Sequence, residues 1–427
     1  MGVYFQARRY RRIAMTKTLL LLTLAVSVMG AQTYDLLLKG GRVVDAKNRI
    51  NALMDVAIAG GKIARVAANI PASASRKTVS VSGLLVTPGL IDIHTHVFSR
   101  PDLKTLERDS SVQPDAHSFR SGVTTMVDAG TSGWRTFPTF KARVIDKAQT
   151  RVLALLNIAG WGMGTGKEDE LSELDAAAAA RTAKANRGVI VGFKSAHFGG
   201  PGWESVEAAV KAGRETDLPV MVDFGYLNKV RNLPTLLLDK LRPGDIYTHC
   251  FSGHREELVA GNKVNPAMIT GRKRGIIFDV GFGAGSFYWY VAVPALQQGF
   301  PPDSISTDLH TGSMNGGMKS MTNSMSSILN LGVPIEQVIA MSTWNPAREI
   351  KQPALGNLDT GAEADVAVLR VENGQFGFVD SAGAVNQGTQ RISAELTLRK
   401  GKVMWDRNGR ASENWKTFPY NRKEWTK

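Results

Sequence analysis

Two histidines separated by one residue, His94 and His96, end an apolar segment of the chain. The segment, residues 84–93, is rich in leucine, isoleucine and valine, which is typical of a buried β-strand. Because side chains alternate across a strand, positions i and i+2 point to the same side. Two neutral imidazoles placed in this way can bind one metal ion together. Two buried, hydrogen-bonded histidines would have the same spacing, so the pair alone leaves both interpretations open.

Other strand-like segments also end in residues that can bind metals or move protons. Apolar segments before and after residue 94 alternate with helical stretches such as 170–184 and 205–215, which gives eight βα units. This pattern predicts an α/β fold, a (β/α)8 TIM barrel, whose active site lies at the C-terminal ends of the strands. We therefore expect the strand ends to meet at one mouth, with Lys194 on the fourth strand, Asp223 on the fifth, His249 on the sixth and Asp308 on the eighth.

The two ends of the chain have a different pattern from the middle. Short strand-like runs with Gly-Gly turns occupy residues 34–63, and runs of the same character return at 364–369 and 396–403. We expect both ends to fold together into a small β-sandwich domain formed by residues 31–83 and 356–427. The barrel would then comprise residues 84–355.

The motif PGLIDIHTH, residues 88–96, resembles the first-strand signature of the amidohydrolase superfamily. Residues 241–249, 306–312 and 342–347 are similar to its amidohydrolase/deacetylase, or dihydroorotase-like, branch. The resemblance runs from about residue 35 to residue 405 and implies a barrel with a binuclear metal centre. It further implies a hydrolase that cleaves an amide or ester bond of a small acylated compound.

The resemblance implies a role for each strand-end residue. Lys194 would be carboxylated by CO2, and the resulting carbamate would bridge two divalent metal ions, with Zn2+ as the expected element. Asp308 would bind one ion and act as the catalytic base that takes the proton of the attacking water. The metal ligands would therefore be His94, His96, Lys194, Asp223, His249 and Asp308.

One of these ligands departs from the superfamily pattern. The fifth strand ends in Asp223, where the superfamily usually supplies a histidine. Aspartate also binds zinc, through oxygen, so we interpret Asp223 as a ligand. Two alternatives stay open: Asp223 orients another ligand, or His197, three residues after Lys194, takes the vacant position.

Four residues are candidates for substrate binding. His310 follows Asp308 by two positions, and His254 lies beyond the sixth strand. Phe282 and Trp203 lie in loops after the seventh and fourth strands, where they would line the mouth or pack beneath the loops. The resemblance leads us to expect a histidine near Phe282, and none is present. The glycine-rich residues 281–286 predict a mobile or closely approaching backbone segment rather than a phosphate loop.

Charge and composition limit the classes of partner. The net charge is +14, but five basic residues and no acidic ones lie in the first 30 residues, and their removal leaves +9. The remaining basic residues are scattered among acidic ones, which argues against a nucleic-acid surface. One cysteine, Cys250, excludes an internal disulfide framework.

The first 30 residues resemble a secretory signal peptide. A basic stretch precedes an apolar run over residues 19–28, and small residues follow at Gly30 and Ala31. We expect a periplasmic or secreted protein with no stable membrane association after cleavage; an uncleaved anchor is the alternative. The sequence leaves the oligomeric state open, although barrels of this type commonly self-associate.

Three other functions fit parts of the pattern. A lactone or phosphotriester hydrolase would use the same centre, and a deaminase would need one metal ion. A non-catalytic barrel could act as a binding module, but such a protein is expected to lose ligands, whereas His94, His96, Lys194, His249 and Asp308 are all present. The metal-dependent hydrolase is therefore the leading interpretation.

Overall fold

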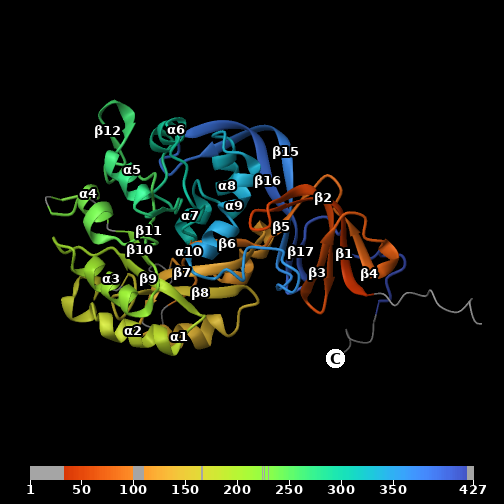
Figure 1. The fold of residues 1–427 in the computed structure, drawn as a ribbon, viewed down its shortest axis with the longest axis horizontal. Helices are drawn as coiled ribbons and strands as arrows, with labels where there is room; N and C mark the ends of the chain where they lie inside the picture. The colour runs from red at the N-terminus through yellow and green to blue at the C-terminus, as the bar shows by residue number, and fades with distance from the viewer. Residues whose placement is uncertain are drawn as a thin grey trace, which may run out of the picture.

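A computed structural model describes residues 33–99, 110–164, 167–223, 225, 227–228 and 230–420. The predicted signal peptide lies outside these residues. The described chain forms two large sheets, a parallel sheet within a shell of helices and a mixed sheet beside it (Figure 1). No helix of the described residues is both long and apolar enough to cross a membrane.

Seven parallel strands form the sheet that positions the candidate site. They are hydrogen-bonded in the order β14-β11-β10-β9-β8-β7-β6. Both faces of this sheet carry buried apolar side chains, as expected for a parallel sheet covered by helices. The strands are β6 (Leu90–Thr95), β7 (Val123–Gly133), β8 (Arg151–Asn157), β9 (Ile190–Ala196), β10 (Val220–Asp223), β11 (Ile246–Tyr247) and β14 (Ile277–Phe278).

Residues 304–309 close this sheet. Ser304 forms a parallel bridge with Asp279, and Leu309 forms one with Thr95 at the other edge. The His96 amide also donates to the Leu309 carbonyl at 2.9 Å. The eighth segment therefore joins the first strand to the seventh, although it pairs through isolated bridges rather than as a regular strand. The predicted α/β barrel class is confirmed.

Helices surround the barrel between its strands. The longer ones bury alanine and valine against the sheet; in α2, Asp175 caps the first turn by accepting from the amides of Ala177 and Ala178. The helices are α1 (Phe137–Phe140), α2 (Ala176–Ala185), α3 (Glu204–Thr216), α4 (Leu233–Thr235), α5 (Pro266–Lys273), α6 (Trp289–Gln297), α7 (Thr311–Asn315), α8 (Met321–Leu329), α9 (Ile335–Ala340) and α10 (Trp344–Glu349).

The mixed sheet is built from both ends of the described chain. Its order is β17-β16-β15-β5-β1-β2-β3, with β4 also paired to β1. Val86 of β5 lies opposite Val43 on one side and Val368 on the other. The strands are β1 (Tyr34–Asp45), β2 (Ile50–Ala59), β3 (Lys62–Ala67), β4 (Ser75–Ser80), β5 (Leu85–Pro88), β15 (Val366–Val379), β16 (Val385–Arg399) and β17 (Lys402–Asp406); a separate pair, β12 (Leu258–Val259) and β13 (Lys263–Val264), lies elsewhere.

The chain passes from the mixed sheet to the barrel at Gly89. The sequence pattern predicts one buried strand leading to His94, but the structure divides it into β5 and β6. A Cβ atom at Gly89 would lie 2.2 Å from the Thr124 hydroxyl oxygen, so only glycine fits this crossing. The Gly89 amide donates to the Asp365 carbonyl at 2.8 Å, which ties the crossing to the C-terminal part of the chain.

The hairpin formed by β15 and β16 extends from the mixed sheet over the barrel. In Figure 1 these blue strands run past α8 toward α6. The Asn330 side chain donates to the Gln390 carbonyl at 2.7 Å, and the Trp289 indole donates to the Phe378 carbonyl at 3.2 Å. The tip of the hairpin therefore lies against the loop that follows β14.

Candidate metal centre

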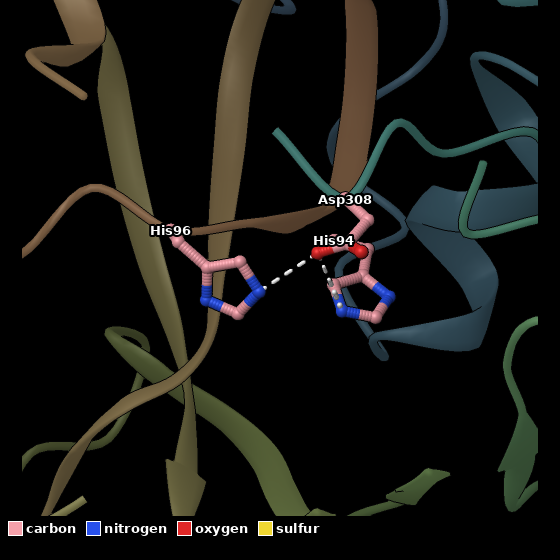
Figure 2. Close-up of side chains that lie close together, drawn as sticks. All are labelled: His94, His96 and Asp308. Atoms are coloured by element: carbon pink, nitrogen blue, oxygen red, sulfur yellow. Dashed lines mark hydrogen bonds and ion pairs between the residues drawn. The ribbon is translucent and has the colours of Figure 1, made fainter. Parts of the chain in front are cut away.

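Three predicted ligands meet at the C-terminal end of β6. The Nε2 atom of His96 lies 2.9 Å from Asp308 Oδ1, and that of His94 lies 3.5 Å from the same oxygen (Figure 2). Among the described residues, these side chains form a group whose ligand atoms all lie within 4.8 Å of one another. The bridge between Thr95 and Leu309 causes this meeting, because it brings the eighth segment beside the first strand.

Hydrogen bonds set the tautomer of His94. The Thr248 hydroxyl donates to Asp279 Oδ2 at 2.7 Å, so its single proton is already used. His94 Nδ1, 3.0 Å from the Thr248 oxygen, must therefore be the donor of the bond between them. The lone pair of His94 Nε2 is left facing the site, as a metal ligand requires.

His96 is oriented in the same manner. Its Nδ1 lies 3.0 Å from the Thr131 hydroxyl, whose proton goes to the buried carboxylate of Asp128. The lone pair of His96 Nε2 therefore faces the carboxylate of Asp308. Two such acceptors do not approach to hydrogen-bond distance without a cation between them, either a proton on the imidazole or a metal ion. This arrangement fits a metal site.

Lys194 lies beside this group at the end of β9. Its Nζ atom is 3.0 Å from His94 Nε2, and its side chain is fully buried. Burial lowers the pKa of the Lys194 ammonium, and the charge of Arg255 contributes in the same direction, although nearby carboxylates oppose the shift. A lowered pKa increases the fraction of neutral amine, which is the form that reacts with CO2.

Asp223 and His249 form a second pair across the mouth. The Gly281 carbonyl accepts from His249 Nδ1 at 2.6 Å, so the Nε2 lone pair of His249 faces Asp223 Oδ2 at 3.3 Å. Here too an imidazole lone pair and a carboxylate face each other. The rings of His94 and His249 are 5.0 Å apart, which places this pair next to the first group.

Burial and neighbouring groups keep the candidate ligands His94 and Asp308 in metal-binding forms. Burial lowers the pKa of His94 well below its usual value, with a further contribution from Lys194, so the imidazole stays neutral. Burial alone would raise the pKa of Asp308, but the imidazoles of His94, His96 and His249 outweigh it and hold that pKa well below its usual value. Both residues are therefore ready to donate electron pairs.

Comparison with known proteins agrees with this geometry. The profile described as "Amidohydrolase family" matches residues 85–231 and 290–404. A deacetylase from Enterococcus faecalis is 30% identical over 381 residues, which cover 87% of this chain and 99% of the relative. The chain belongs to the amidohydrolase family.

Solved structures of similar proteins support this assignment. A crystal structure of an adenine deaminase superposes with a TM-score of 0.79 and 29% identity over 87% of this chain and all of the other. A crystal structure of a dihydroorotase gives 0.75 and 27%, over 87% of this chain and 99% of the other. The predicted family and the predicted class of enzyme, a hydrolase, are confirmed. The family profile leaves residues 232–289 of this amidohydrolase unmatched.

The candidate substrate residues of this amidohydrolase lie in different surroundings. His310 Nε2 is 3.9 Å from Asp308 Oδ2, at the edge of the metal group. His254 donates from Nε2 to the Gly285 carbonyl at 2.8 Å. Phe282 is fully buried and stacks on Phe287, and Trp203 is buried near the start of α3. The proposed substrate contacts of all four residues stay predictions, and His310 is the nearest to the site.

The glycine-rich loop after β14 approaches the site as closely as the sequence suggested. A Cβ atom at Gly283 would lie 2.6 Å from Asp308 Oδ2, and one at Gly281 would lie 2.7 Å from His249 Nδ1. Both glycines also have a positive φ, 46° and 61° in chain order. The expectation of a closely approaching backbone is confirmed, and its reason is contact with two candidate ligands.

Sequence reasoning missed Arg255, which contacts Asp223. Its Nη2 atom forms an ion pair with Asp223 Oδ1, and the side chain is buried. His197, the alternative ligand, is half exposed, and its Nε2 lies 3.7 Å from Asp223 Oδ2. Arg255 lies in an irregular loop after β11, where no periodic pattern marks a buried position. The only available signal was an arginine six residues after a strand-end histidine.

Proposed function

We propose that this protein is a metal-dependent hydrolase that removes an acyl group from a small acylated compound by cleaving an amide or ester bond. The observation that carries the proposal is the meeting of His94, His96 and Asp308 beside the buried Lys194. The similarity to the deacetylase from Enterococcus faecalis, which covers 87% of this chain, supports the acyl group as the part removed.

The residues present fit two divalent ions, with Zn2+ as the expected element. His94, His96 and Asp308 would hold one ion, since their ligand atoms already converge. His249 and Asp223 would hold the other, and Lys194 as a carbamate would supply an oxygen to each. When bound, the ions would activate a water molecule and polarise the scissile carbonyl.

Lys194 must be modified to fill the bridging role. The ammonium first releases one proton to solvent and becomes a neutral amine. Nζ then bonds to the carbon of CO2 as one C–O π bond opens, and a second proton leaves to solvent, so that a cation has become an anion. The position of Nζ, 3.0 Å from His94 Nε2, supports this role, because a carboxylate formed there would lie beside the first group of ligands. An unmodified ammonium at this position would repel both ions.

Asp308 would take the proton of the attacking water and pass it to the leaving group. Its carboxylate is charged and directed into the mouth, where Oδ2 faces His310 at 3.9 Å. His310 Nδ1 accepts from the Gly312 amide at 3.1 Å, so in the neutral ring the proton lies on Nε2, facing the same space. That N–H can bind an oxygen of the substrate.

Metal analysis and acyl release test this proposal together. The protein, produced with added zinc and bicarbonate, is expected to hold about two ions per chain by elemental analysis. Its intact native mass should include one added CO2, and it should release acetate from N-acetyl or O-acetyl compounds. The Lys194→Ala variant should lose both the two bound metal ions and the activity. A metal-free protein, or full activity of this variant, would overturn the proposal.

Deamination is the second candidate, because the adenine deaminase structure is among the most similar ones. The group formed by His94, His96 and Asp308 could support it with one ion. Release of ammonia from adenine, with about one ion per chain and no added CO2, would favour this function over the first.

Export is proposed on the sequence of residues 1–30. A basic stretch, a short apolar run and small residues in this order support cleavage near Gly30 or Ala31. The test is the N-terminal sequence of protein recovered from the periplasm or medium of a bacterial host. A chain that keeps residues 1–30 and stays with the cell membrane would contradict it.

A further inference from the structure

Asp223 divides its two oxygens between different partners. Oδ1 forms an ion pair with Arg255 Nη2, while Oδ2 faces the Nε2 atoms of His249 at 3.3 Å and His197 at 3.7 Å. A carboxylate bound in this way has one oxygen left for a metal ion. The guanidinium fixes the rotation of the carboxylate, because it holds the other oxygen.

Arg255 is itself held in a fixed position. Its Nε atom donates to the Gly225 carbonyl at 2.9 Å, and its backbone amide donates to Glu257 Oε2 at 3.1 Å. The guanidinium also lies over the Tyr247 ring, 5.7 Å from its centroid. The residue is only 3% exposed, so its cation depends on nearby carboxylates and this ring for stabilisation.

Charge explains why the two residues occur together. A buried arginine next to a metal site would repel the metal ion if it were not paired. An aspartate alone would add a negative charge that a neutral imidazole at the same place would not. The pair of Asp223 and Arg255 has no net charge, so it resembles a neutral ligand while it offers an oxygen atom.

We propose that Arg255 is a positioning residue that holds Asp223 as a one-oxygen ligand of the second metal ion. This inference rests on the proposed function, because it assumes a two-metal centre. Arg255 touches neither the metal nor the substrate in this role. It acts through Asp223, in the way that hydrogen-bonded partners of metal ligands orient them and strengthen binding. Arg255 lies within residues 232–289, which the family profile does not match.

Metal stoichiometry and affinity test the role of Arg255 directly. Substitution Arg255→Gln removes the charge and the fork of donors, and it is expected to weaken the second ion about 10–100-fold and leave about one ion per chain. The double variant Asp223→His with Arg255→Gln removes both charges and supplies a neutral imidazole. It is expected to regain two ions, which a general loss of stability would not allow.

Arg242→Gln is the matched control. Arg242 forms an ion pair with Asp245 at 2.7 Å, at the opposite end of the barrel strands from the metal group. Breaking that pair should leave two ions bound. Zinc titration against a competing chelator measures the affinity, and elemental analysis measures the number of ions per chain. Neither measurement depends on catalysis.

The outcomes separate this inference from the proposed function. If wild-type protein binds two ions and Arg255→Gln binds them with unchanged affinity, the positioning role is wrong and the hydrolase proposal stands. Single-ion wild-type protein would also overturn the positioning role. Metal-free wild-type protein would overturn the proposed function itself. If Arg255→Gln does not fold, the double variant still decides, because failure of a folded double variant to bind two ions contradicts the inference.

Discussion

Each histidine of the first metal group is oriented by a threonine that is itself bonded to a buried carboxylate. Asp279 accepts from Thr248, which in turn accepts from His94; Asp128, Thr131 and His96 repeat the pattern on the next strands. A third buried carboxylate, Asp92, accepts from the Thr307 amide at 3.1 Å, beside Asp308. The two candidate histidine ligands are therefore held in fixed orientations, because their rings cannot turn without breaking these bonds.

Removing the hydroxyl of Thr248 should weaken metal binding. The change Thr248→Val keeps the shape of the side chain but leaves His94 Nδ1 without its acceptor. We expect zinc affinity to fall about 10–100-fold, measured by chelator competition. Thr397→Val is the control, since the Thr397 hydroxyl donates to the Phe119 carbonyl at 2.7 Å, in the mixed sheet. Equal zinc affinity in the two variants would contradict the orienting role of Thr248.

A substitution at Asp308 should separate its two proposed functions, metal binding and proton transfer. Asn at position 308 keeps an oxygen that can bind a metal ion but cannot accept a proton from water. We expect Asp308→Asn to keep its metal content and to lose about 10²–10⁴-fold in kcat. Elemental analysis and acetate release measure the two effects. Activity near that of wild type would show that another residue is the base.

At the scale of elements, the hairpin of β15 and β16 supports the loop next to the site. The Ser381 hydroxyl accepts from the amides of Ser286 and Phe287 at 3.2 and 3.1 Å, and the Ser381 amide donates back to the Phe287 carbonyl at 2.9 Å. The same loop places Gly283 against Asp308. A strand connection at the far end of the mixed sheet thus fixes the backbone around the Asp308 carboxylate.

Loss of the Ser381 hydroxyl should loosen this loop. In Ser381→Ala, the amides of Ser286 and Phe287 lose their acceptor. We expect the free energy of local opening at these amides to fall by about 1 kcal/mol, which makes their hydrogen exchange roughly fivefold faster. Ser393→Ala in the same hairpin is the control, because no residue described in the structure hydrogen-bonds the Ser393 hydroxyl. Exchange measured by mass spectrometry over residues 281–288 should rise in the first variant and stay unchanged in the second.

The sequence predicts the strand ends well and the loop contacts poorly. His94, Lys194 and Asp308 could be placed because apolar strands and barrel topology bring their ends together. Arg255 could not, since its contact with Asp223 joins an irregular loop to the end of β10, and the path of that loop depends on the closed barrel. Phe282 illustrates the same limit: its burial against Phe287 follows from the hairpin contact, and alternation along a strand does not apply to a glycine-rich loop.

At the scale of the whole molecule, an ion cluster joins the last strands of the mixed sheet. The Glu395 carboxylate accepts from Arg410 at 2.6 Å and from Asn408 at 2.7 Å, and Arg370 lies 3.3 Å away. Burial favours the protonated acid, but these donors outweigh it and lower the pKa of Glu395 to about 2. A carboxylate whose pKa is lower in the folded state stabilises the fold above its unfolded pKa.

Acid should therefore destabilise the protein partly through Glu395. The contribution is complete above about pH 4.5 and is lost as the pH falls toward 2, and it amounts to about 3 kcal/mol. Urea unfolding at pH 6 and pH 3 should show a large difference between wild type and Glu395→Gln at pH 6 and a smaller one at pH 3. Glu372→Gln, at the more exposed pair with Arg391, should cost less than about 1 kcal/mol. A difference independent of pH would contradict the assignment.

The pairing of β5 with both β1 and β15 has a consequence for how the chain folds. Strands β1 to β5 come first in the sequence, but one edge of β5 pairs with β15, where Ala367 lies opposite Thr87, 280 positions later. That open edge can attract other strands until β15 arrives. Because the hairpin tip also supports the loop beside Asp308, the mouth of the barrel is complete only when this C-terminal hairpin has packed. The same late segment of the chain therefore completes both the mixed sheet around β5 and the surroundings of Asp308.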